Sequence, residues 1–127
     1  MTDTITPVDP PELPSSPAFA QGMILPAAST LYVGGQNGVD AAGTLLDGLQ
    51  AQTEQALRNV LAVLAAAGSG AEHTAKLTIY LDPSVDPNPA FEASRAVWTA
   101  RTAVTVLAIA PARAGALVEI EAVATIP

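Results

Sequence analysis

The C-terminal stretch, residues 101–126, constrains the fold of this chain more than any other. Two runs rich in β-branched residues, at 101–109 and 116–126, flank a Pro/Gly connection at 111–115, which predicts a strand, a loop and a strand. Side chains alternate along a strand, so the second run has two distinct faces. The face expected to lie in the core carries Val118, Ile120, Ala122, Ala124 and Ile126, and the opposite face carries Leu117, Glu119, Glu121 and Val123.

Charged residues occur at two places in this otherwise apolar stretch. Arg101 opens the first run, and Glu119 and Glu121 project from one face of the second. A guanidinium binds a carboxylate through paired hydrogen bonds and stays charged at any physiological pH. The cation and the carboxylates therefore make either a small-molecule site or a solvated sheet edge, and the residues alone leave both open.

Two helices are expected upstream of this stretch. Apolar residues recur at helical spacing from residue 47 or 48 to about Ala67, with Asp47 suited to the N-cap and Gly68 to the C′ position. A second helix is expected from an N-cap at Asn88 to about Thr99, because Pro89 would occupy its first turn.

Strands and a proline-rich lead-in account for the remaining residues. The expected strands are residues 18–25, 30–34 and 74–81. Residues 26–29 are expected to join the first two strands as a hairpin. Residues 1–16 are expected to be extended or disordered because they are rich in proline, which leaves 17–127 as a single domain. The order β-β-α-β-α-β-β predicts an α+β fold with two helices on one face of a mixed sheet.

Composition excludes several classes of function. The net charge is −7 with only five cations, which argues against nucleic acid or an anionic membrane as partner. The chain has no cysteine, so disulfides, thiolate nucleophiles and thiolate metal sites are excluded. Neither a signal peptide nor a spanning segment is recognisable, and a cytoplasmic protein is expected. Half of the residues are hydrophobic and 13% are charged, so further copies of the chain are expected to cover part of the apolar surface.

Several short motifs, in this order and spacing, resemble those of the YjgF family, also called the Rid or RidA family. The resemblance covers nearly the whole chain from about Ser16. The motifs are Gly35-Gln36, Gln52 with Leu57-Arg-Asn59-Val60, Ala67-Gly68, Lys76-Leu-Thr-Ile-Tyr80, Ala100-Arg101-Thr102 and Val118-Glu-Ile-Glu-Ala-Val-Ala124.

The resemblance implies a chorismate-mutase-like fold assembled as a homotrimer with clefts between subunits. It implies hydrolysis of reactive imines and enamines, such as 2-aminoacrylate and its imino tautomer, to 2-keto acids and ammonia, with neither a metal nor an organic cofactor. In that scheme Arg101 holds the substrate carboxylate and Glu119 orients the attacking water. Gly35, through its backbone N–H, and Phe19 and Ala103 are the further expected substrate contacts.

The chain also departs from the family pattern. Thr99 stands where the family has proline, Phe19 where it often has tyrosine, and Gly34 where it commonly has serine or threonine. The segment 91–101 is several residues shorter than in RidA-type members, and the pocket phenylalanine of the loop 82–89 has no match. These changes suggest two alternatives, an enzyme of a biosynthetic pathway that acts on a larger or less polar imine, and a non-enzymatic ligand-binding trimer.

Other polar residues are expected to be structural. Glu121 lies about 7 Å from Glu119 along the same face, and Lys76 belongs to a strand. Arg95 and Arg113 are surface cations or additional anion contacts, and the single histidine, His73, is expected to be solvated or capping. The glycines at 34–38 are no dinucleotide fingerprint, because no helix follows them directly.

Overall fold

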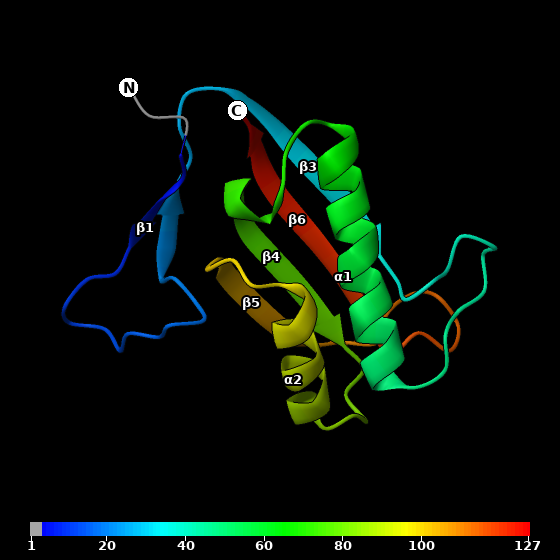
Figure 1. The fold of residues 1–127 in the computed structure, drawn as a ribbon. Helices are drawn as coiled ribbons and strands as arrows, with labels where there is room; N and C mark the ends of the chain where they lie inside the picture. Colours follow the sequence, from blue (N-terminus) through cyan, green and yellow to red (C-terminus); the bar gives the residue numbers. More distant parts are fainter. Residues whose placement is uncertain (1–3) are drawn as a thin grey trace.

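A four-stranded mixed sheet forms the centre of the fold, and both α-helices cover the same face of it (Figure 1). The structure is a computed structural model that describes residues 4–127. In chain order its elements are β1 (Thr6–Val8), β2 (Gly22–Ile24), β3 (Ser29–Gln36), α1 (Leu49–Ala66), the short 3₁₀-helix η1 (Ala71–His73), β4 (Thr74–Leu81), α2 (Pro87–Val97), β5 (Ala103–Ala108) and β6 (Val118–Ile126). The predicted α+β class with two helices on one face of a mixed sheet is confirmed.

The strand order of the sheet is β3-β6-β4-β5. Strand β6 pairs antiparallel with both β3 and β4, whereas β5 pairs parallel with β4. Helix α2 supplies the crossover that a parallel pair requires. The two C-terminal strands are therefore both present, as the sequence predicts, but β4 lies between them.

The core lies between the sheet and the helices. The alternation expected in β6 is confirmed, because Val118, Ile120, Ala122 and Ala124 are all buried against the helix layer. Ile126 is only partly buried, since it pairs with Ser29 at the end of the sheet. From α1, the buried apolar side chains are Ala56, Leu57, Val60 and Leu64.

Both helices begin differently from expectation. Helix α1 has Gly48 as its N-cap, with a φ of 88° that glycine adopts without strain, so the expected capping by Asp47 is wrong. Helix α2 is capped by Asp86, whose carboxylate accepts the N–H of Asn88 at 3.0 Å. Pro87 follows in the first turn, where its missing N–H costs no hydrogen bond, so the predicted cap at Asn88 is two residues late.

The N-terminal strands pair with each other rather than with the sheet. Strand β2 is antiparallel to β1, which lies within the lead-in expected to be extended or disordered. The predicted hairpin between residues 18–25 and 30–34 is therefore wrong, because the turn at 26–29 has no glycine or asparagine to favour a tight reversal. The first three residues of the predicted lead-in lie outside the described part of the chain.

The segment before β2 reaches the free edge of β5. The N–H of Ala20 donates to the carbonyl of Thr102 at 3.1 Å, and Phe19 forms an isolated parallel bridge with Thr102. Within residues 4–127, no helix is long and apolar enough to cross a membrane.

Candidate functional site

The face of the sheet opposite the helices is polar, and we call it the open face. Alternation places Leu77, Ile79 and Leu81 of β4 toward the helices, so Thr78 and Tyr80 project from the other side. The register sets Tyr80 beside Glu119 and Thr78 beside Glu121. The polar side chains of the open face are Lys76, Thr78, Tyr80, Thr105, Glu119 and Glu121. This face therefore gathers the carboxylates that the sequence singled out.

Glu119 lies directly over Gly35 of β3. A Cβ atom added to Gly35 would overlap the Glu119 carboxylate, whereas the same atom on Gly34 would meet nothing within 4 Å. Asn37 Nδ2 donates to Glu119 Oε1 at 3.4 Å and to the carbonyl of Val118 at 3.2 Å. The carboxylate is thus placed by the absence of a side chain below it and by an amide beside it.

Helix α1 positions the loop that carries Asn37. Asn59 Nδ2 donates to the carbonyls of Asn37, at 3.1 Å, and Val39, at 2.9 Å. The buried Gln52 accepts the N–H of Leu117 at 2.8 Å and donates to the carbonyl of Leu46 at 3.0 Å. Gln52 and Asn59 both belong to a motif that carries the family resemblance, but the sequence did not indicate these positioning roles.

Tyr80 closes the other side of Glu119. Its hydroxyl donates to the Glu121 carboxylate, and this hydrogen bond, aided by burial and by the charges of both glutamates, raises the pKa of Tyr80. Tyr80, Glu119 and the loop residues 109–112 line a hollow of about 140 Å³. The N–H of Ile109 donates to the carbonyl of Leu81 at 2.9 Å, which holds that loop against the end of β4. The hollow is large enough for water and a small ligand group.

Arg101 sits at the other end of the sheet and already has partners. Its Nη1 donates to Asp9 Oδ2 at 2.6 Å, and its Nε donates to the carbonyl of Ser16 at 2.9 Å. Asp9 in turn accepts the N–H of Gln21 at 2.9 Å. The hydrogen bond from Arg101, together with that from Gln21, lowers the pKa of Asp9. An internal carboxylate therefore occupies one edge of the guanidinium.

One chain does not bring Arg101 and Glu119 together. Ala103 pairs with Lys76 at the start of β4, and Glu119 pairs with Tyr80 near its end. Arg101 comes two residues before Ala103, so roughly six strand residues, or about 20 Å, separate the two side chains along β4. A single small ligand cannot contact both residues of the same chain.

The expected site residues thus fall into two groups. Gly35 accompanies Glu119 on the open face, and Ala103, two residues after Arg101, pairs with Lys76. Phe19 bridges to Thr102 next to Arg101, but its ring packs on Phe91 of α2, with centroids 5.6 Å apart. No group of three or more potential metal-ligating His, Asp or Glu side chains occurs within residues 4–127.

Known proteins resemble this chain over almost its whole length. The family model described as Endoribonuclease L-PSP matches residues 12–126. A Rid-family protein of unknown function from Yersinia pestis has 29% identity, covers 96% of this chain and 98% of its own, and superposes with a TM-score of 0.81.

Two further solved structures show the same fold. RidA from an Antarctic Psychrobacter species has 26% identity, with 99% of this chain and 97% of that chain covered and a TM-score of 0.72. The yjgF gene product of E. coli has 25% identity, with 86% and 88% covered and a TM-score of 0.70. No curated protein matches significantly.

Proposed function

Because this chain belongs to the endoribonuclease L-PSP (Rid) family, we propose that it is a cofactor-independent hydrolase of imines and enamines. Its substrates are reactive 2-imino acids of the 2-aminoacrylate type, and its products are 2-keto acids and ammonia. The observation that carries the proposal is the Glu119 carboxylate, held over Gly35 by Asn37 and facing a hollow beside Tyr80.

The chemistry needs one positioned water and one proton acceptor. The imine carbon is electrophilic, so water held by Glu119 attacks it and forms the new C–O bond while the C=N π electrons move to nitrogen. Glu119 takes a proton from that water and returns one to the nitrogen. Collapse of the resulting amino alcohol moves the hydroxyl proton to the nitrogen, forms the carbonyl, breaks the C–N bond and releases ammonia, which leaves the 2-keto acid. Gly35 N–H is the proposed backbone donor to the substrate.

The proposed substrate carboxylate binds Arg101 of a second copy of the chain. The separation of about 20 Å along β4 rules out Arg101 and Glu119 of one chain on one small substrate. We therefore place the site in a cleft between subunits of a homotrimer. One subunit contributes Gly35 and Glu119, and its neighbour contributes Arg101, Ala103 and, at the border, Phe19.

A second candidate keeps this mechanism but changes the substrate. Asp9 already neutralises Arg101, and a paired guanidinium attracts a further carboxylate less strongly than a free one. This contact favours a larger or less polar imine, supplied within a biosynthetic pathway, over a small 2-imino acid.

A ligand-binding trimer without catalytic activity is the remaining alternative, and it predicts no turnover. The family description also names a ribonuclease. We do not assign RNA as substrate, because the net charge of −7 and five scattered cations do not make a basic surface.

The test is release of 2-keto acid from imino acids generated in situ by an amino-acid oxidase. Wild type, Arg101→Ala and Glu119→Ala are compared across small and bulky side chains, with the exposed Glu92→Ala as a matched control. The proposal predicts acceleration by wild type and Glu92→Ala that both site variants lose. Preference for bulky side chains would select the second candidate, and absence of acceleration on every imine would leave the binding role.

A further inference from the structure

A second cavity lies on the helix-covered side of the sheet. It has a volume of about 570 Å³ and is enclosed by α2, the N-terminal half of α1, β4, β5 and residues 17–19. Cavities that bind small molecules measure roughly 300–1,000 Å³ and are mostly apolar. Glu119 projects from the opposite face of the sheet, and neither Glu119 nor Arg101 lines this cavity, which therefore differs from the proposed deaminase site.

Most of the aromatic side chains of the chain meet at this cavity. The sequence has one tryptophan, two tyrosines and two phenylalanines, and the tryptophan and both phenylalanines line the cavity. Phe19 and Phe91 are 38% and 42% exposed and tilt against each other at 55°, which places their rings at the mouth. Trp98 is buried, and its indole N–H donates to Thr102 Oγ1 at 2.9 Å, so the cavity meets its ring. Such walls favour a flat aromatic ligand.

The hydroxyl groups that the helices bring to the lining already donate hydrogen bonds. Thr53 Oγ1 donates to the carbonyl of Leu49 at 2.7 Å, and Ser94 Oγ donates to the carbonyl of Phe91 at 2.6 Å. An apolar ligand body therefore leaves these donors satisfied when it displaces water. The interior of the cavity therefore favours an apolar ligand body, and a polar group of the ligand fits only at the rim of the cavity.

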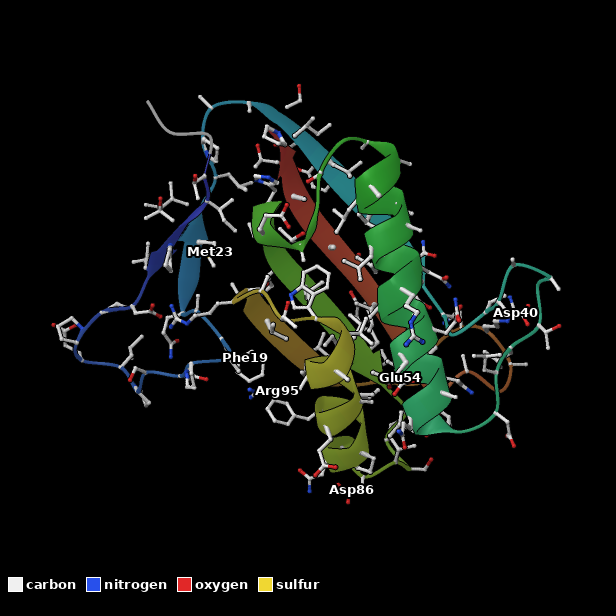
Figure 2. All side chains as sticks on the ribbon, in the orientation of Figure 1. Phe19, Met23, Asp40, Glu54, Asp86 and Arg95 are labelled. Atoms are coloured by element: carbon white, nitrogen blue, oxygen red, sulfur yellow. The ribbon has the colours of Figure 1, made fainter. Side chains whose placement is uncertain are left out.

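Arg95 supplies a cation at that rim. Its Cζ lies 5.7 Å from the centroid of the Phe91 ring, and its side chain is exposed (Figure 2). Within residues 4–127, Arg95 forms no ion pair, whereas Arg58 pairs with Glu54 and Arg101 pairs with Asp9. A guanidinium beside an apolar opening fits a ligand that carries one carboxylate.

We propose that this cavity, which we call the aromatic cavity, binds a flat aromatic monocarboxylate. The rings of the ligand lie against the packed Phe19 and Phe91 rings and extend toward Trp98, and its carboxylate pairs with Arg95. The site is formed by a single chain. It shares Phe19 with the border of the proposed deaminase site but contains neither Arg101 nor Glu119, so the two proposals stand or fall separately.

The probe is 2-naphthoate, measured by titration calorimetry and by quenching of Trp98, the single tryptophan. Neutral 2-naphthamide and small acetate are the matched control ligands.

Five variants accompany the probe. Arg95→Gln removes the rim cation, and Arg58→Gln removes the same charge from another helix. Val104→Phe fills the cavity from β5, and Ser94→Leu fills it from α2 in case the first variant does not fold. Arg101→Ala tests whether the probe binds at the deaminase site instead.

The proposal predicts saturable binding of 2-naphthoate, weakened roughly tenfold in Arg95→Gln, the size of one charge-assisted contact. Arg58→Gln and Arg101→Ala should bind as wild type, 2-naphthamide should bind more weakly, acetate should not bind, and a folded filling variant should lose binding. Three results would overturn it: no binding to wild type, binding that survives Arg95→Gln and both filling variants, or binding lost in Arg101→Ala alone.

Discussion

The two faces of the sheet are built from the same strands but differ in what they can do. Along β4, Leu77 and Ile79 border the aromatic cavity, while the alternating Thr78 and Tyr80 belong to the open face. On the helix side a single chain encloses a complete cavity. On the open face, Arg101 and Glu119 lie too far apart within one chain to share a ligand. Alternation with a period of two therefore places the aromatic cavity and the Glu119 side chain on opposite faces of the same strands.

This difference has a direct consequence for experiments. Chemistry on the open face should depend on Glu119, on its surroundings and on a second copy of the chain. Ligand binding on the helix side should depend on none of these. A substitution on one face of the sheet should therefore change the function of that face and leave the function of the other face unchanged.

Glu119→Gln should have the largest effect. The amide keeps the shape of the side chain but cannot accept a proton from water, so kcat for imine hydrolysis should fall by about 10²–10⁴-fold. Binding of 2-naphthoate to the aromatic cavity should stay at the wild-type level. The measurement is 2-keto acid release alongside calorimetry, and retention of more than half of the activity would remove Glu119 from the reaction.

Gly35→Ala should have the next largest effect. The new methyl group overlaps the Glu119 carboxylate and displaces it, and a shift of about 1 Å can lower the rate about 100-fold. Gly34→Ala is the matched control, because its methyl group meets nothing within 4 Å. Assays of both variants on the same imine should show a large loss for the first and little for the second. Equal behaviour of the pair would contradict the placement of Glu119.

Asp9→Asn should change substrate preference by a smaller amount. Removing the internal carboxylate leaves Arg101 with an unpaired charge, so KM for small 2-imino acids should decrease several-fold, the size expected for a partly exposed ion pair. Glu12→Gln removes a nearby exposed carboxylate and should leave KM unchanged. An unchanged KM in Asp9→Asn would show that Asp9 does not compete with the substrate.

Tyr80→Phe should have the smallest effect, a change in how stability depends on alkaline pH. Folding raises the pKa of Tyr80 above the usual value for tyrosine, chiefly through its hydrogen bond to Glu121. A raised pKa stabilises the fold below the unfolded pKa, and this contribution is lost as pH rises through the folded pKa. Stability measured by denaturant titration from pH 9 upward should therefore decline less steeply in the variant. An identical decline would mean that Tyr80 and Glu121 are uncoupled in solution.

Local patterns predicted the elements of the sheet well. The expected strand at 74–81 matches the observed bounds of β4, and alternation identified the buried face of β6. Helical spacing located α1 to within two residues at each end. These features depend on neighbouring residues, whose periodicity is visible in the chain itself.

Contacts between distant residues were not predictable in the same way. Asp9 and Arg101 are 92 positions apart, and the residues around each of them do not indicate that the two side chains pair. The pairing of β2 with β1 and the placement of β4 between β5 and β6 also depend on which edges remain free after the sheet assembles. The aromatic cavity combines segments from across the chain. The composition shows that the chain has few aromatic residues, but it does not predict that three of them line one cavity.

Complementation between two inactive variants tests the central claim most directly. Arg101→Ala and Glu119→Ala, each inactive alone, are denatured together in equal amounts, refolded and assayed for imine hydrolysis. If each site takes Arg101 from one subunit and Glu119 from its neighbour, random mixing restores about a quarter of the wild-type sites. Recovery of about that fraction of activity is the expected result. No recovery from a correctly assembled mixture would contradict it, because a site built within one chain would stay defective in every subunit.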